Sequence, residues 1–260
     1  MLSIQQFRER VRASLETTPH ADLADDVAAT MTPAIYLLAE SAEDDSFAVG
    51  ASKVGGRPDL TQPWPVQGGK ALYFLAQFNL AELAPHDADR LFAASGLLSF
   101  FLGQRAIEGE WESGNFAVLY EPDLARLKRT NLPDSGFEEP DYAVPAQSTK
   151  FKASCQQDIF NLDADSDICM EIFNIIEAIP ERFEANFPRH SANFLLGNEG
   201  YNDSNFLAER GEQVLFSLGR SEFDWPFLDG NSIHGFVFFI PVADLTVLHL
   251  DRIRLAYTAD

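Results

Sequence analysis

The sequence predicts a mixed α+β fold with largely antiparallel sheets, and two observations predict it. Strand-like and helix-like segments do not alternate along the chain as they would in βαβ units, so the strands should pair mainly with antiparallel neighbours. In addition, two pairs of apolar strands have nearly equal spacing: Gly96 opens a strand nineteen residues after Gln77, and Gly235 opens one eighteen residues after Ser217. A recurring spacing indicates one supersecondary unit used twice. We therefore expect an internal pseudo-repeat of two similar halves, about 33–129 and 149–260.

An N-terminal helical segment is expected over residues 1–32, ahead of both halves. Ser3 and Gln6 form the pattern of a capping box. The apolar residues that follow fall on one helical stripe: Ile4, Phe7, Val11 and Leu15. This pattern predicts a first helix over about 3–16. A second, shorter helix is expected over 22–31, because that alanine-rich stretch ends just before Pro33.

The first half should contain four strands and a loop rich in glycine and proline. The strands are expected at the apolar stretches 35–38, 72–78, 97–102 and 116–120. Residues 53–65 are predicted as loop, since Gly55 and Gly56 allow positive φ and the prolines remove backbone donors that a sheet needs. After the second strand, Asn79 can cap a short helix, with Glu82 three residues on.

The second half begins after a long surface connection over residues 130–148, which carries three prolines, a glycine and several acids. An edge strand at 151–154 and a central amphipathic helix are expected next. The helix should begin at Ser166 or Asp167, because isoleucines then recur one to two turns apart: Ile168, Ile172, Ile175, Ile176 and Ile179. Pro180 either kinks this helix or starts a continuation to Phe187. The other expected elements are a loop over 186–205 and apolar strands at 214–218, 236–240 and 253–257.

The charge of the chain limits its partners. Nineteen Lys and Arg residues against forty Asp and Glu residues give a formal net charge of −21. Such a field repels the phosphates of nucleic acids and of anionic membranes, so neither is an expected partner. A basic partner protein is allowed. Local basic groups such as Arg126, Lys128 and Arg129 are expected to form a solvated helix face.

Three further features predict a cytoplasmic protein. The N-terminus lacks the charged start and apolar run of a signal peptide. No stretch approaches the ~20 apolar residues of a membrane span. Two cysteines, Cys155 and Cys169, cannot form a disulfide framework.

Three stretches of the first half resemble the YwqG-like bacterial proteins, known as the DUF1963 domain family. They are KVGGRPDLTQPWP (53–65), ALYFLAQFNLAEL (71–83) and GLLSFFLG (96–103). The later GEQVLFSLGRS and HGFVFFIPVADL resemble the closing half of the family more loosely. The resemblance implies a single domain over residues 1–260 and a mixed fold built from similar halves, without any established catalytic activity.

The second half departs from the family pattern at two places. Where relatives usually carry a Gln-x-Asp-x-Asp-like strand, this chain has Ser217–Ser221. Where they carry a Trp-Gly-Asp turn, it has Leu228–Gly230, with Trp225 displaced upstream. If those polar groups build a ligand or metal site in relatives, this chain has lost part of it.

The chain carries none of the spacings typical of common catalytic or cofactor sites. Five histidines show no paired metal-ligand spacing, and the G-x-S-x-G, G-x-x-x-x-G-K-[ST] and G-x-G-x-x-G patterns are absent. The acidic run 163–167 matches the start of a calcium loop, but Ile168 and Asn174 occupy the positions that need glycine and glutamate. We expect these acids to cap the following helix instead. No catalytic residue, metal ligand or cofactor is predicted.

The loop over 53–65 and the strand after it carry the candidate binding surface. Its members are Gly55, Gly56, Arg57, Pro58, Asp59, Trp64 and Gln77. Bare backbone at the glycines can approach a partner, Trp64 offers a rigid anchor, and Gln77 is an amide in an apolar strand. The alternative is architectural: the loop folds over the sheet, Trp64 fills the core, and Gln77 bonds to loop backbone.

Two functions remain open. The first is a non-catalytic binding protein, of which one version neutralises a basic partner as acidic immunity-type proteins do for toxins, with its charge speeding the encounter. The alternative is a metal-assisted or small-ligand-binding enzyme with a site in the cleft between the two halves. Loop 53–65, Gln77 and acids such as Asp59 or Asp203 would line that cleft. The sequence leaves the oligomeric state open.

Overall fold

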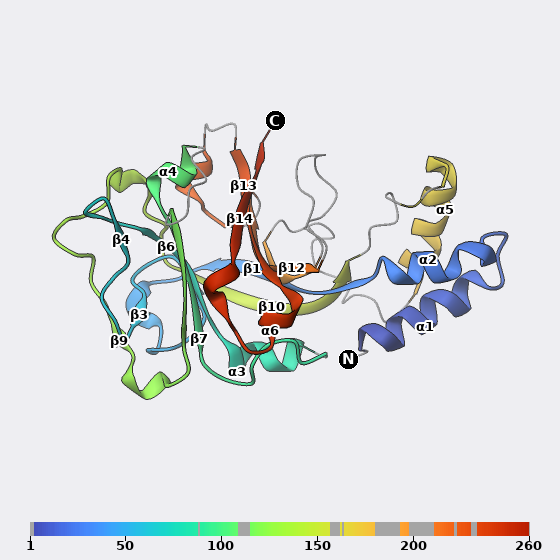
Figure 1. The fold of residues 1–260 in the computed structure, drawn as a ribbon, viewed down its shortest axis with the longest axis horizontal. Helices are drawn as coiled ribbons and strands as arrows, with labels where there is room; N and C mark the ends of the chain where they lie inside the picture. The colour runs from blue at the N-terminus through green and yellow to red at the C-terminus, as the bar shows by residue number, and fades with distance from the viewer. Residues whose placement is uncertain are drawn as a thin grey trace.

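The predicted α+β class is confirmed by the arrangement of helices and strands. The computed structural model describes residues 3–87, 89–108, 115–156, 162, 164–179, 193–197, 211–220, 223–229 and 233–259. Figure 1 shows a body built on a ten-stranded antiparallel sheet, and a lobe of helices that stands at one end of it. The predicted continuation to Phe187 and most of the loop predicted over 186–205 lie outside the described residues.

Three helices form the lobe: α1 (Ile4–Leu15), α2 (Ala24–Ala29) and α5 (Ser166–Glu177). The predicted capping box of α1 is confirmed, because the Gln6 N–H donates to Ser3 Oγ at 3.2 Å and the Ser3 N–H donates to Gln6 Oε1 at 2.9 Å. A short 3₁₀ turn, η1 (Ala21–Leu23), joins α1 to α2.

The central amphipathic helix packs against the N-terminal helices. Its isoleucine stripe joins the apolar residues of α1 and α2 in one core, made of Phe7, Val11, Leu15, Ala24, Val27, Ala28, Met31, Ile172, Ile176 and Ile179. The predicted cap of this helix is also confirmed, since Asp165 Oδ1 accepts a hydrogen bond from the Asp167 N–H at 2.9 Å. Asp163, the first residue of the acidic run, lies outside the described residues.

Two long strands form the centre of the sheet. β1 (Thr32–Ser41) pairs antiparallel with β10 (Gln147–Gln156), from Thr32 opposite Gln156 to Ser41 opposite Gln147. The strand predicted at 151–154 occurs within β10, where these residues pair with Ala34–Leu37 of β1. β10 reaches its other neighbour, β2 (Lys53–Val54), at Gln147, so the edge position of 151–154 stays a prediction. A strand's apolar pattern reports which faces are buried, and it does not report which strands flank it.

One group of strands continues the sheet on each side of this centre, in the order β14-β13-β12-β11-β1-β10-β2-β6-β7-β8. The first group adds β6 (Tyr73–Asn79), β7 (Leu97–Leu102) and β8 (Phe116–Glu121). The second comprises β11 (Phe194–Leu196), β12 (Glu212–Gly219), β13 (Ile233–Pro241) and β14 (Arg254–Ala259). All the strands predicted from apolar stretches thus occur. That the two groups are repeats of one unit stays a prediction.

Four phenylalanines fill the space between the two strand groups. Phe78 and Phe100 come from β6 and β7, and their rings meet Phe216 of β12 with centroids 5.3 and 4.8 Å apart. Phe238 of β13 lies 5.2 Å from Phe100. Because these rings touch, the two groups must pack against each other, as Figure 1 shows for β6–β8 and β12–β14. The space between these strands, where the enzyme alternative requires a cleft, is filled by aromatic side chains.

Short elements complete the body. Two small ribbons pair β3 (Asp59–Leu60) with β9 (Lys128–Arg129) and β4 (Val66–Gln67) with β5 (Lys70–Ala71). The short helices are α3 (Leu80–Leu83), α4 (Gln104–Ile107) and α6 (Val242–Leu245). The 3₁₀ turns are η2 (Asp44–Ser46), η3 (Ala84–His86), η4 (Leu124–Arg126), η5 (Pro140–Tyr142), η8 (Pro226–Leu228) and η9 (Leu250–Arg252). Among the described helices, none is long and apolar enough to cross a membrane.

The predicted surface connection is anchored on the body by Tyr73. Its Phe137 stacks on the Tyr73 ring at a centroid distance of 4.8 Å. The Tyr73 hydroxyl accepts a hydrogen bond from the Glu139 N–H at 3.0 Å and lies 2.6 Å from Gln104 Oε1. Burial raises the pKa of this phenol from 10.0 to about 12, although its bond to the Glu139 backbone acts in the opposite direction.

We expect Tyr73 to make the protein sensitive to alkali. The stability that its protonated phenol contributes is complete below pH 10 and is lost as the pH rises toward 12, because the unfolded chain releases the proton first. Tyr73→Phe should cost about 1 kcal/mol at neutral pH and remove a loss of about 2–3 kcal/mol between pH 10 and 12. Urea unfolding at a series of pH values measures both effects. Tyr120→Phe, which removes an exposed hydroxyl bonded to the Ser95 carbonyl, should keep the alkaline loss; an unchanged pH slope in Tyr73→Phe would contradict the assignment.

Candidate functional site

Two glycines shape the loop that carries the candidate binding residues. Gly55 and Gly56 have φ of +62° and +71°, and their N–H groups donate to the carbonyls of Leu75 and Val144 at 2.8 and 3.0 Å. A Cβ on Gly55 would lie 2.1 Å from the Pro145 carbonyl oxygen. Glycine is therefore required here by both the backbone conformation and the lack of space.

Gln77 fastens the loop to the sheet. Its side chain is 0% exposed. Its Oε1 accepts a hydrogen bond from the Asp59 N–H at 2.9 Å, and its Nε2 donates to the Ala51 carbonyl at 2.8 Å and to Asp59 Oδ2 at 2.7 Å. Both ends of the amide are used within the protein, so Gln77 has the architectural role that the sequence left as an alternative.

Asp59 is the buried centre of this arrangement. Its Oδ2 also accepts the Gly50 N–H at 2.8 Å, and its Oδ1 accepts Nε of Arg129 at 2.6 Å. The Arg129 guanidinium then donates to the carbonyls of Asp44 and Phe47 at 2.8 and 3.1 Å. Arg129 lies in β9 and its guanidinium is bonded within the protein, so the prediction of a solvated helix face is wrong for this residue. Arg126 and Lys128 are exposed.

Asp44 forms a second ionic centre next to the first. Its Oδ1 lies 2.6 Å from Lys53 Nζ, and its Oδ2 lies 2.6 Å from Arg57 Nε. Lys53 is fully buried and also donates to the Arg57 carbonyl at 2.5 Å. Burial alone would raise the pKa of the Asp44 carboxyl, but the hydrogen bonds from Lys53 and Arg57 outweigh burial and hold that pKa below its usual value of 3.8.

Trp64 lies apart from the ionic centres. It is 6% exposed, and its indole N–H donates to the Leu72 carbonyl at 2.8 Å. Its ring packs edge-on against Phe101 and Phe137, with both centroids 6.1 Å away. Trp64 therefore fills a satellite core beneath the loop and does not face a partner.

The structure brings together four of the seven candidate residues and leaves little of them at the surface. Gly56, Arg57, Asp59 and Gln77 belong to the two connected ionic centres. Gly55 and Pro58 are buried in the same loop, and Trp64 is buried in the separate core described above. Only Gly56 and Arg57 are half-buried. A role of this loop in recognition stays a prediction, and it would have to act through these two residues.

Three members of the site were not identified from the sequence: Asp44, Lys53 and Arg129. Lys53 stands inside the KVGGRPD stretch, which is the one signal that could have found it. Asp44 is one of three neighbouring acids, and Arg129 pairs with a residue 70 positions away. The local sequence around Asp44 or Arg129 does not indicate which residue it pairs with.

The charged side chains of this site form ion pairs with one another, which hold them in fixed positions. A small, open hollow beside it is lined by Asp59, Thr61, Ser99 and Glu121 among others, and neither Trp64 nor Gln77 lines it. No group of three or more His, Cys, Asp or Glu side chains in the described part of the chain could hold a metal ion. Asp203, which the enzyme alternative invokes, lies outside that part.

The sequence matches the model of a known protein family. A family model described as "Domain of unknown function (DUF1963)" matches residues 52–257. Lys53, Arg57, Asp59, Gln77 and Arg129 lie within the matched region, while Asp44 and the helices α1 and α2 lie outside it. No curated protein matches the sequence.

Proposed function

This chain belongs to the DUF1963 family of domains of unknown function, and we propose that it is a non-catalytic protein that binds a basic partner protein. In the finer form of the proposal the protein acts in the bacterial cytoplasm and neutralises a basic effector, as an immunity-type protein would. Its support is one acidic surface segment, together with the internal use of the polar side chains in the family-like loop.

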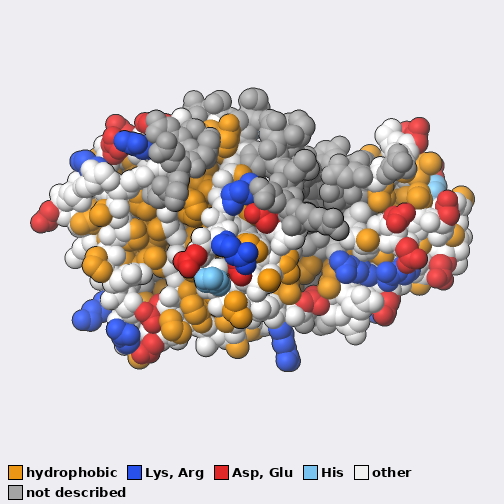
Figure 2. Space-filling view, in the orientation of Figure 1, with side chains coloured by type: hydrophobic (Ala, Val, Ile, Leu, Met, Phe, Trp, Pro, Cys, Tyr) orange, Lys and Arg blue, Asp and Glu red, His pale blue; other side chains and the backbone are white. Residues whose placement is uncertain are grey.

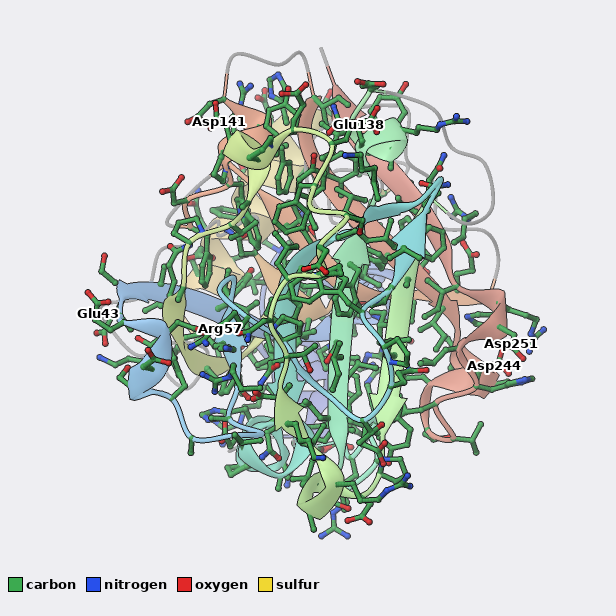
Figure 3. The ribbon with its side chains drawn as sticks, turned by 90° about the vertical axis from the view of Figure 1, so that its left-hand side faces the viewer. Glu43, Arg57, Glu138, Asp141, Asp244 and Asp251 are labelled. Atoms are coloured by element: carbon green, nitrogen blue, oxygen red, sulfur yellow. The ribbon has the colours of Figure 1, made fainter. Side chains whose placement is uncertain are left out.

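The observation that carries the proposal is the surface connection over residues 130–148, which contains no Lys or Arg and which we call the acidic connection. Four of its carboxylates are exposed: Asp134, Glu138, Glu139 and Asp141. None of them forms an ion pair with a side chain in the described ranges. Figure 3 shows Glu138 and Asp141 at the same end of the body.

Anchoring makes the acidic connection suitable for recognition. The Ala71 N–H donates to the Gly136 carbonyl at 2.9 Å, and Phe137 stacks on Tyr73. Carboxylates on a segment held in this way lose less conformational entropy when a partner binds. The helical lobe offers a less uniform surface, since its acids are interspersed with Lys and Arg side chains in Figure 2.

The net charge of −21 adds a long-range contribution. A field of one sign attracts a partner of the opposite sign before contact, so it raises the association rate and makes that rate depend on salt. The acidic connection would then fix where the partner docks.

Neutralising the acidic connection should abolish capture of the partner. The variant Asp134→Asn/Glu138→Gln/Glu139→Gln/Asp141→Asn removes four charges and leaves the anchors in place. In pull-downs from native lysate, we expect the unchanged chain to retain a basic protein at low salt and to release it at high salt. The variant should retain little of it at either salt concentration.

A matched variant separates local recognition from total charge. Glu16→Gln/Asp22→Asn/Asp26→Asn/Asp229→Asn also removes four exposed carboxylates, none of which belongs to the acidic connection. It should retain the partner almost as well as the unchanged chain. If both variants retained equally little of the partner, net charge alone would explain the binding, and the acidic connection would not be the docking site. The absence of any salt-sensitive basic partner would refute the proposed function.

A further inference from the structure

We propose that this protein carries a binding site for an oxyanion, either a carboxylate or a phosphate group, and that its own Asp44 occupies the site. The site, which we call the cradle, consists of Lys53, Gly56, Arg57 and Arg129. It adjoins the acidic connection, through the Arg57–Asn131 and Gly56–Val144 hydrogen bonds, but uses none of its four carboxylates. Its ligand has the opposite charge to the partner proposed above.

Three cations surround one carboxylate in the cradle. Lys53 Nζ and Arg57 Nε lie 2.6 Å from Asp44 Oδ1 and Oδ2 respectively, and an Arg129 guanidinium nitrogen lies 3.7 Å from Oδ1. The Arg57 N–H also donates to Oδ1, at 3.3 Å. Charge-assisted bonds of this kind suit carboxylate and phosphate oxygens equally well.

The backbone of the cradle is shaped for close approach. A Cβ on Gly56 would lie 2.4 Å from Asp44 Oδ1, so only glycine leaves room for the oxygen. The Gly55 and Gly56 N–H groups donate to the Leu75 and Val144 carbonyls, and the Arg57 N–H that follows them faces the carboxylate.

The cradle requires an anion. The Lys53 side chain is 0% exposed, and a buried ammonium without a counter-charge would be strongly unfavourable. Burial lowers the pKa of Lys53, and the hydrogen bond to Asp44 counteracts that effect. The carboxylate of Asp44 therefore stabilises the fold, because it compensates the charge of the buried Lys53 ammonium.

The present occupant comes from a superficial segment that an external anion could displace. Asp44 lies in η2, a turn of three residues, and Glu43, Asp45 and Ser46 around it are all exposed. In Figure 3, Glu43 projects outward on the side of this segment away from Arg57. The cradle lies within the family match, while Asp44 is supplied from outside it.

Asp44, which is part of the chain, competes with any external anion for the cradle. The apparent affinity of an external anion is reduced by the fraction of molecules in which Asp44 has left the cradle. Removing the Asp44 carboxylate should therefore reveal the intrinsic affinity.

Calorimetric titration of Asp44→Ala with inorganic phosphate and, separately, with acetate tests the site. We expect saturable binding of one anion per chain, at least about tenfold tighter than in the unchanged protein. Tighter binding of phosphate would assign a phosphate ligand, and binding of acetate at least as tight would assign a carboxylate. Asp45→Ala, which removes an exposed partner of the same Arg57 but leaves the cradle filled, should bind as weakly as the unchanged chain. No saturable binding to Asp44→Ala, or equal binding to Asp45→Ala, would overturn the proposal.

Hydrogen exchange of the unchanged chain tests whether the occupant can leave. The Ser46 and Phe47 N–H groups are bonded within η2, to the Glu43 and Asp44 carbonyls at 2.9 and 3.4 Å. Saturating phosphate or acetate should speed their exchange, while sodium chloride at the same ionic strength should not. Because it uses the unchanged chain, this measurement tests the proposal even if Asp44→Ala does not fold. Unchanged exchange rates in phosphate, acetate and sodium chloride would contradict the proposal that an external anion displaces Asp44.

Discussion

Replacing Gly55 with alanine is expected to cost about 2–5 kcal/mol of folding free energy, from two causes that add. A non-glycine residue held near φ +62° is strained by about 1–2 kcal/mol. The new methyl group would also overlap the Pro145 and Val144 carbonyl oxygens, at 2.1 and 2.6 Å. Relieving such overpacking typically costs about 1–3 kcal/mol, because neighbouring backbone must move. Chemical denaturation of both proteins measures the difference.

Gly68→Ala is the matched control for this prediction. Gly68 has nearly the same backbone conformation, with φ +58°, but an added Cβ there meets nothing within 4 Å. Its substitution should cost only the strain of about 1–2 kcal/mol. Equal stability of the two variants would contradict the close packing of Gly55 against the backbone of Val144 and Pro145.

Asp59→Ala is the second change with a large expected effect, about 3–5 kcal/mol of destabilisation. The carboxylate accepts bonds from the Gly50 N–H, the Gln77 amide and the Arg129 guanidinium, and it is buried. Its removal leaves an amide donor and a cation without their acceptor in a region with little access to water. The midpoint of urea unfolding should fall sharply, and the Arg129 end of β9 should lose protection from hydrogen exchange.

Two comparisons make this prediction specific. Glu40→Ala breaks an exposed ion pair with Lys150 and should change stability by less than about 1 kcal/mol. Asp59→Ala/Arg129→Met removes both charges and should recover part of the loss, since the buried cation is removed as well. A single Asp59→Ala variant as stable as Glu40→Ala would contradict the role of Asp59 as the buried centre of the site.

Local features of the fold were predictable because their causes are local. The Ser3 capping box, the isoleucine stripe of α5 and the apolar strands β6, β7, β12 and β13 depend on residues a few positions apart. The order of strands depends instead on pairings between distant segments. The position of β10 inside the sheet is an example, because its neighbours β1 and β2 are both more than 90 residues earlier in the sequence.

The candidate site was predictable only in part. The sequence singled out the loop from Gly55 to Asp59 and the amide of Gln77, because glycine pairs and a polar residue in an apolar strand are unusual in themselves. It could not choose between recognition and architecture, since that depends on whether the side chains find partners inside the protein. Gln77 finds Asp59 and Ala51, which are 18 and 26 residues away.

By itself, the sequence determined the fold class, the helix caps, the family-like loop and the net charge of −21. Only the tertiary structure decided that Trp64 and Gln77 lie in the core, that the central helix joins the N-terminal lobe, and that Lys53, Arg57 and Arg129 converge on Asp44. The physical reason is the range of the interactions. Capping and periodic burial act over a few residues, whereas a buried ion needs a counter-charge that folding alone can bring close.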